Sequence, residues 1–185
     1  IGDKKYYFLI EKWFELHDKS QNKIDGNWGN HSMFNPYIRF QNSFHQFIIY
    51  EYWNRPINYS NTIVDNILKC QDHKGHFAPW PGGSGCYDYD AIHTLIKFGL
   101  NNNYKEELII EALNHNLKAQ QDNQNHDGGF CESRERPYSI MYALNKNNLK
   151  FILNGDSIEI IYQRMRHTLS VSRVINNKIN NHWSD

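Results

Sequence analysis

Apolar residues recur every three or four positions through most of the chain, in segments separated by polar turns. In the first segment, Phe8, Leu9, Trp13, Phe14 and Leu16 fall close to helical spacing. This period is that of an amphipathic α-helix, and no segment is a convincing strand. The pattern predicts seven helices, at 4–17, 37–53, 62–70, 88–98, 105–121, 137–144 and 156–174.

Cap and turn residues set the expected helix boundaries. Thr62 with Asp65 fits a capping box that opens the third helix, and Gly99 suits the position just after the fourth. Pro137 fits the first turn of the sixth helix. The fifth helix is expected to bury one stripe, made of Leu108, Ile109, Ala112, Leu113 and Leu117.

Three copies of a polar turn, with glycine beside an aromatic residue, divide these helices into pairs. The copies are 25–29, 71–77 and 120–130, with Trp28, Phe77 and Phe130 as their aromatic residues. Phe77 follows Trp28 by 49 residues and precedes Phe130 by 53. Such a period is one helical hairpin, which is too small to bury its own apolar face, so neighbouring hairpins must stack. We therefore expect the three turns at one end of the stack, with their aromatic residues wedged between hairpins.

Composition limits the class of protein. The 185 residues suit a single domain, 1–185, with a sizeable core. Twenty basic and 20 acidic residues cancel, so no overall field draws the chain to nucleic acid or to an anionic membrane. The longest apolar runs are far too short for a membrane span. Cys70, Cys86 and Cys131 form an odd set without a CxxC pair, which favours reduced thiols and a cytoplasmic setting.

A helix ending in Gln, followed by polar residues and then Gly and an aromatic residue, resembles the repeat of the terpenoid cyclase and protein prenyltransferase α/α toroids. The matching stretches are 68–77 and 117–130, with a looser copy at 16–28. The resemblance implies an all-α fold of antiparallel helical hairpins that form a partial α/α toroid, with about three and a half hairpins. Related α/α barrels of carbohydrate-active enzymes use similar hairpins, so the motif indicates architecture better than chemistry.

Two functional motifs of these families are matched only in part. Class II terpene cyclases open an inner helix with Asp-x-Asp-Asp-Thr-Ala, and the segment 88–92 keeps two acids but lacks the adjacent Asp and the Thr. Protein prenyltransferases bind zinc through an Asp-x-Cys pair and a later His. Here Ser84 stands two positions before Cys86, and the segment 138–140 has no His. We therefore predict no metal site and no cofactor.

Asp88 and Asp90 are the main catalytic candidates. Two carboxylates held within a few ångströms disfavour double ionisation, so one keeps a raised pKa and can act as an acid. The alternative is that Asp88 caps the fourth helix and Asp90 favours its positive end. His93 lies three positions after Asp90 and can share its helix face, either as a third catalytic residue or as a structural histidine.

The substrate-binding candidates come from three places. His45 is a polar position in an aromatic helix, so it faces either a cavity or a hydrogen-bond partner on a neighbouring helix. Trp80, in a Pro-Gly-rich loop, can stack on a sugar or an isoprenoid. Arg134 and Arg136 precede the sixth helix, where they either clamp an anion or belong to a solvated charged loop. Tyr138, at the start of that helix, completes the set.

The leading hypothesis is an enzyme domain with a pocket at the loop end, using carboxylate acid–base chemistry on an isoprenoid-type substrate. A saccharide-acting α/α-barrel enzyme, hydrolase or lyase, is the first alternative, because a carboxylate pair beside aromatic rings suits glycoside chemistry. A non-catalytic interaction module is the second. The expected partner is a small-molecule or saccharide substrate. Closed toroids contain more hairpins than this chain supplies, so we expect a homodimer or a missing N-terminal region.

Overall fold

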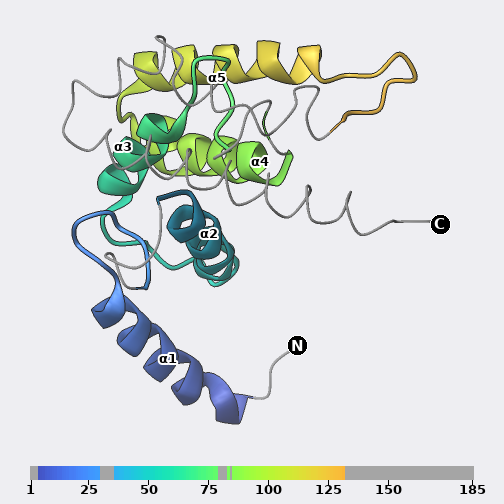
Figure 1. Cartoon of the computed structure of the whole chain (residues 1–185). Coiled ribbons are helices and arrows are strands. Elements are labelled where there is room, and N and C mark those ends of the chain that lie inside the picture. Colours follow the sequence, from blue (N-terminus) through green and yellow to red (C-terminus); the bar gives the residue numbers. More distant parts are fainter. Residues whose placement is uncertain (1–3, 30–35, 79–82, 84, 132–185) are drawn as a thin grey trace, which may run out of the picture.

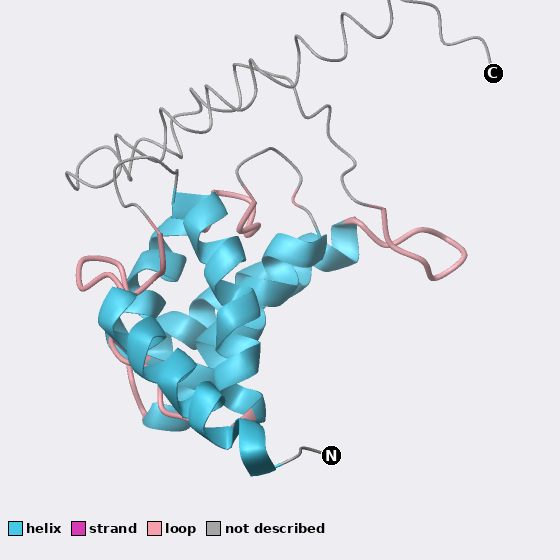
Figure 2. Cartoon of the chain, turned by 90° about the horizontal axis from the view of Figure 1, so that it is seen from below, coloured by secondary structure: helices cyan, strands magenta, loops and turns pink. Residues whose placement is uncertain are grey.

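The computed structural model describes residues 4–29, 36–78, 83 and 85–131, which form a set of packed helices (Figure 1). The main helices are α1 (Tyr7–Ser20), α2 (Pro36–Tyr52), α3 (Ser60–Cys70), α4 (Gly85–Thr94) and α5 (Glu106–Asp122). Three short helical segments are η1 (Lys4–Tyr6), η2 (Leu95–Gly99) and η3 (Leu100–Asn102). These ranges contain no strand, only an isolated bridge between Gln124 and Phe130 (Figure 2). The all-α prediction is confirmed for this part of the chain, and the predicted helices 137–144 and 156–174 lie outside it.

The predicted capping box at the start of α3 is wrong. The helix begins at Ser60, and the residue before it, Tyr59, has a left-handed backbone (φ 57°) without a side-chain cap. Asp65 points instead to the segment before α5. Its carboxylate accepts hydrogen bonds from the Tyr104 hydroxyl at 3.1 Å and from Lys105 at 2.7 Å. Asp65, which the local pattern assigned to a helix cap, therefore makes long-range hydrogen bonds instead.

The fourth helix begins earlier than predicted and does not end as predicted. α4 starts at Gly85, so Asp88 lies in its first turn rather than at the N-cap. After Thr94 the backbone continues as the π-helical segment η2 and then as η3. Gly99 was expected just beyond the helix, and it is the last residue of η2. It packs closely on α5: a Cβ at position 99 would lie 2.2 Å from Cδ1 of Ile109. Its lack of a side chain allows that packing.

The second helices of the first two hairpins, α2 and α4, lie side by side and run in the same sense. Gln41 in the early part of α2 contacts Cys86 at the start of α4, at 3.5 Å. Phe47, further along α2, meets Phe98 in η2, with ring centroids 5.2 Å apart. Because contacts advance together along both helices, the turns that precede them lie at the same end of the pair.

The hydrophobic core lies between α2, α3, η2 and α5. Its largest buried members are Phe40, Phe44, Phe47, Ile63, Ile67, Phe77, Leu95 and Ile109. Of the three predicted wedges, Phe77 is completely buried in this core and Trp28 packs against it. Phe130 is 60% exposed, so the wedge prediction is wrong for the third turn as the structure describes it.

The predicted buried stripe of α5 is only half right. Ile109 and Ala112 are buried, whereas Leu108 and Leu117 are more than half exposed. The helix buries the polar residue Asn116 instead, and this side chain donates a hydrogen bond to the Gly75 carbonyl at 2.8 Å. A polar side chain that has a partner can thus replace leucine at a buried position.

The three Gly-aromatic turns share one backbone hydrogen-bond pattern. In each turn, the carbonyl of the residue just before the aromatic residue accepts a hydrogen bond. The donor is a backbone N–H that lies four or five positions earlier in the chain. These bonds join Asn22 to Asn27 at 2.8 Å, Asp72 to His76 at 2.8 Å and Asn125 to Gly129 at 2.7 Å. The intervening glycines all have positive φ, of 73° at Gly26, 104° at Gly75 and 87° at Gly128. The turns are therefore repeats in structure as well as in sequence.

A glutamine side chain closes each turn from inside. The side-chain amides of Gln21, Gln71 and Gln124 donate to the carbonyls of Gly26, Gly75 and Gly128, at 2.7, 3.0 and 3.2 Å. The third copy thus uses Gln124, not the pair 120–121 to which the sequence pattern was matched.

Candidate functional site

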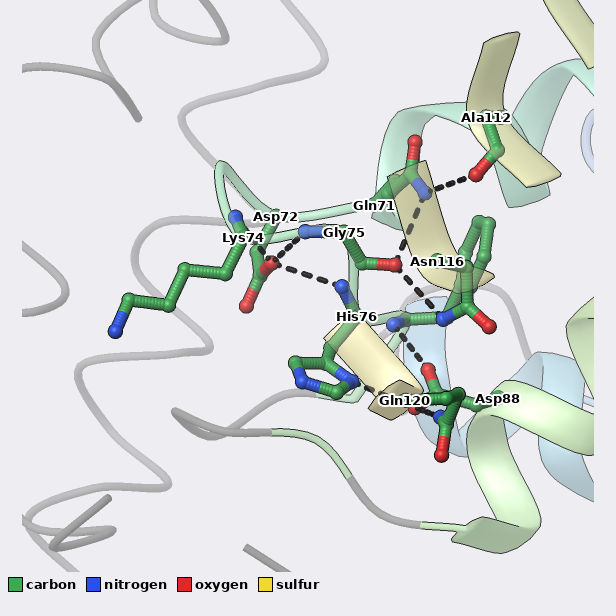
Figure 3. A network of polar contacts seen from close by, with 10 residues as sticks. Gln71, Asp72, Lys74, Gly75, His76, Asp88, Ala112, Asn116 and Gln120 are labelled. Atoms are coloured by element: carbon green, nitrogen blue, oxygen red, sulfur yellow. Dashed lines mark hydrogen bonds and ion pairs between the residues drawn. The ribbon is translucent and has the colours of Figure 1, made fainter. Parts of the chain in front are cut away.

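Asp88 is the centre of a buried polar network that joins the second turn to α4 and α5 (Figure 3). Its side chain is 1% exposed. Oδ1 accepts the Phe77 backbone N–H at 2.7 Å, and Oδ2 pairs with Nδ1 of His76 at 2.7 Å and accepts from the Gln120 amide. Both carboxylate oxygens are engaged by protein groups, so this residue fixes the start of α4 against the turn.

The second turn itself is held by further hydrogen bonds in the same network. Oδ1 of Asp72 accepts the N–H groups of the segment 74–76 at 2.8 to 2.9 Å. The Gln71 amide bridges the carbonyls of Gly75 and Ala112, which ties the turn to α5. Figure 3 shows Asp88 from α4, and Asn116 and Gln120 from α5, on the side of the turn that faces these helices. The network makes the turn a rigid support for α4.

Asp90, two residues further along α4, has a different environment. It is only 5% exposed, and its carboxylate receives no hydrogen bond from the residues that the structure describes. Burial raises its pKa to about 6, and the nearby imidazoles of His45 and His93 oppose that rise. The structure therefore brings together three of the predicted site residues, one from α2 and two from α4, and gives the acid a pKa near neutrality.

His93 also belongs to an ion-pair cluster between α4 and α2. Its Nε2 lies 2.9 Å from Oε2 of Glu51, and the other oxygen of Glu51 pairs with Lys97 at 2.7 Å. The hydrogen bond from Lys97 is the main cause that lowers the pKa of Glu51, which His93 lowers further. The carboxylate of Glu51 holds the imidazole beside Asp90.

An aromatic ring lies next to this cluster on the same pair of helices. Tyr89 is 60% exposed, and its ring packs edge-on against Phe44, with centroids 6.0 Å apart. The same ring lies 6.1 Å from the imidazole of His93. The accessible tyrosine face beside the acid and the histidine can take an apolar or a cationic group.

Four of the predicted site residues, Trp80, Arg134, Arg136 and Tyr138, lie outside the described residues. Among those described, no group of three or more His, Cys, Asp or Glu side chains could hold a metal ion. In the same ranges, no helix combines the length and the apolar character that crossing a bilayer requires.

Sequence reasoning missed three polar residues that organise the site. His76 and Gln120 bind Asp88, and Glu51 binds His93. Of these, only His76 occupies a position that the sequence pattern marks, because it directly precedes the aromatic residue of its turn. Asn27 and Gly129 occupy the same position in the other two turns. Glu51 and Gln120 are single charged or polar positions on helices, and only the tertiary packing gives them a partner.

Comparisons with known proteins add no further constraint, since no family model, curated protein or solved structure matches this chain.

Proposed function

We propose that this chain is an enzyme domain of the α/α-toroid type, in which Asp90 supplies acid–base chemistry to an isoprenoid-type substrate. The observation that carries the proposal is the carboxyl of Asp90, which is nearly buried, has a pKa raised to about 6 and lies beside two imidazoles. Acids and bases work best when their pKa is close to the working pH. A carboxyl group at an ordinary surface pKa is almost fully ionised at neutral pH and cannot donate a proton.

The surroundings of Asp90 suit the formation of a carbocation. A proton from this acid to an alkene leaves a carboxylate that stabilises the positive charge, and the rings of Tyr89 and Phe44 add cation–π attraction. His93, held by Glu51, or His45 can take a proton from the carbocation, which re-forms a carbon–carbon double bond, and can then pass that proton to the carboxylate of Asp90. In this proposal Asp88 is a positioning residue that orients α4.

The repeated turns support the toroid part of the proposal. Three turns with the same backbone bonds, positive-φ glycines and closing glutamines are what stacked helical hairpins with a constant rotation require. The pair α2 and α4, side by side in one sense, corresponds to adjacent inner helices of such a ring.

Replacing Asp90 with Asn tests the proposed acid. The assay incubates the purified chain with a panel of isoprenoid diphosphates and linear polyprenes, and detects products by mass spectrometry. For any substrate that the wild type converts, Asp90→Asn is expected to lower turnover by about 10²- to 10⁴-fold, the usual contribution of a positioned acid or base. Its melting temperature is expected to stay the same or to rise, because the amide does not carry the buried charge of the carboxylate.

Asp88→Asn is the matched control, since it makes the same chemical change two residues away. This substitution is expected to lower the melting temperature, because it weakens the contacts with His76 and Gln120. Undiminished turnover in Asp90→Asn would exclude it as the acid, and a large loss of stability in that variant would point to a structural role.

A saccharide is the second candidate substrate, and the exposed ring of Tyr89 favours it. Sugars stack on accessible aromatic faces beside carboxylates, and this ring lies next to His93 and near Asp90 on the same helix. An oligosaccharide panel is expected to shift the fluorescence or the melting temperature of the wild type but not of Tyr89→Ala. An equal response of both proteins would contradict the saccharide hypothesis.

A further inference from the structure

The first two turns each rest on the first helix of the next hairpin. Gly26, in the first turn, lies so close to α3 that a Cβ on it would be 2.4 Å from Cγ1 of Ile63. Gly75, in the second turn, lies equally close to α5, with 2.4 Å from such a Cβ to the carbonyl oxygen of His115. In both places the lack of a side chain lets the turn approach the helix. One packing rule thus joins successive hairpins.

The contact falls at the same register in both helices. Ile63 stands eight residues before Gln71, whose amide closes the turn after this helix, and Asn116 stands eight residues before Gln124. Ile63 and Asn116 are almost completely buried, at 1% and 0% exposure. A preceding turn is therefore expected to rest on the residue eight positions before a closing amide.

The third turn has no such support among the described residues. A Cβ on Gly128 would meet no described atom within 4 Å, and Phe130 is 60% exposed, whereas its counterpart Phe77 is completely buried. The next first helix of the array is the one that the sequence predicts at 156–174. The packing rule makes that segment the expected support of the third turn.

The sequence just after that predicted helix repeats the first turn. Residues 177–183 read Asn-Lys-Ile-Asn-Asn-His-Trp, and residues 22–28 read Asn-Lys-Ile-Asp-Gly-Asn-Trp. The two stretches have the same length, and four of their seven residues are identical. Trp183 follows Phe130 by 53 residues, which is also the interval between Phe77 and Phe130. The later stretch therefore lies in register with the repeat.

Where the two stretches differ, the side chains suit the same turn. Asp25 accepts the N–H of Asn27 through Oδ1 at 3.0 Å, and Asn180 carries a side-chain oxygen at the equivalent position. Gly26 has a positive φ of 73°, and Asn181 takes its place in the later stretch. Asn is one of the residues that adopt a left-handed backbone most readily after Gly. The later stretch is therefore compatible with the backbone of the first turn.

We propose that 176–183 forms a fourth turn of this type, and that the third turn rests on the helix predicted before it, 156–174. Asn176 takes the position of the closing glutamine, and Thr168 stands eight residues before it, so the contact joins Gly128 to Thr168. The third turn is then an interaction surface whose partner is a later segment of the same chain. This inference does not depend on the proposed enzymatic function.

Two substitutions of Asn181 test the fourth turn. A position with positive φ favours Gly over Ala, whereas a helical position favours Ala over Gly. Asn181→Ala is therefore expected to lower the melting temperature of the full chain by about 2–4 °C, and Asn181→Gly to leave it unchanged or to raise it. Asn114, exposed within α5, is the control position, and there the order of the two substitutions is expected to reverse. If alanine at position 181 is as stable as glycine, 176–183 is not a turn of this type.

Hydrogen exchange of the full chain tests the contact of the third turn. Peptides that cover 161–175 are expected to be protected in the wild type. Phe130→Glu on the turn and Thr168→Glu on the predicted helix are each expected to speed that exchange at least about 10-fold, because a charge enters the contact. Phe8→Glu, at a 68% exposed position of α1, is the control and is expected to leave the exchange of these peptides unchanged.

The same measurement distinguishes a failed fold and a different partner. Unchanged exchange in α3 shows that a variant is folded, and where one variant does not fold, the other decides. Exchange of 161–175 is expected to be independent of protein concentration, because the contact lies within one chain. An unprotected segment, exchange that no folded variant changes, or protection that rises with concentration would each overturn the proposal.

Discussion

At the scale of single residues, two acids of one short motif have separate roles. Asp88 and Asp90 are two positions apart, and helical residues with that spacing point in different directions. Asp88 meets the second turn and α5, whereas Asp90 lies toward the histidines of α2 and α4. Repulsion between the two acids predicts a raised pKa for one of them, without saying which. The pKa of Asp90 is indeed raised, but its main cause is burial, and Asp88 is not among the causes.

The raised pKa of Asp90 gives a prediction for stability against pH. A carboxyl whose pKa rises from 3.8 unfolded to about 6 folded binds more protons in the folded state between these values. Its contribution to stability is therefore present below about pH 4 and declines as pH rises through 6. The free energy of unfolding of the wild type, measured in urea, is expected to fall relative to that of Asp90→Asn across this window. Parallel pH profiles for the two proteins would contradict the assigned pKa.

At the scale of helices and turns, apolar periodicity located all five α-helices of the described ranges but not the details of their ends. The left-handed Tyr59 and the early start of α4 at Gly85 have no counterpart in the local pattern. At both helix starts, the acid that the local pattern offers as a cap has a long-range partner instead: Asp65 accepts a hydrogen bond from the Tyr104 hydroxyl, and Asp88 accepts one from the Phe77 N–H. A single sequence shows which residues can cap a helix, but not which distant partner competes for them.

The candidate site was predictable to a similar degree. His45, Asp90 and His93 were each identified as unusual residues, and their proximity follows from the parallel packing of α2 and α4. The Gln-x-x-x-Gly pattern also located the turns. The supporting residues His76, Glu51 and Gln120 could not be assigned, because each acts through a partner from a different element.

A pair of glycines can test the packing of a turn separately from its backbone strain. Gly29 and Gly75 have almost the same φ, 101° and 104°, so alanine at either costs about 1–2 kcal/mol in backbone strain. A Cβ at position 29 meets nothing within 4 Å, whereas at 75 it lies 2.4 Å from a backbone carbonyl of α5. We expect Gly75→Ala to lose about 1–3 kcal/mol more than Gly29→Ala in urea unfolding. Equal losses would mean that the turn does not rest on α5.

At the scale of the whole molecule, stability depends on how well successive hairpins are joined. Repeat proteins are stabilised by the sum of their units and of the interfaces between neighbours. Here each interface combines apolar packing with a glutamine that crosses between units. Gln21 donates to the carbonyl of Asn58 at 2.9 Å, and Gln71 donates to that of Ala112 at 2.7 Å. These side chains close their own turn and attach it to the next hairpin.

Removing one crossing glutamine is therefore expected to loosen α5 from the rest of the fold. Gln71→Ala loses two hydrogen bonds of a partly buried amide, which is expected to cost about 1–3 kcal/mol of unfolding free energy. Hydrogen exchange is expected to speed up most in α5, because that helix loses a direct bond to the second turn. Gln121→Ala, an exposed substitution on the same helix, is the control and is expected to stay within about 0.5 kcal/mol of the wild type. If exchange instead rises evenly over all helices, the hairpins unfold as one unit and the glutamine does not govern a separate interface.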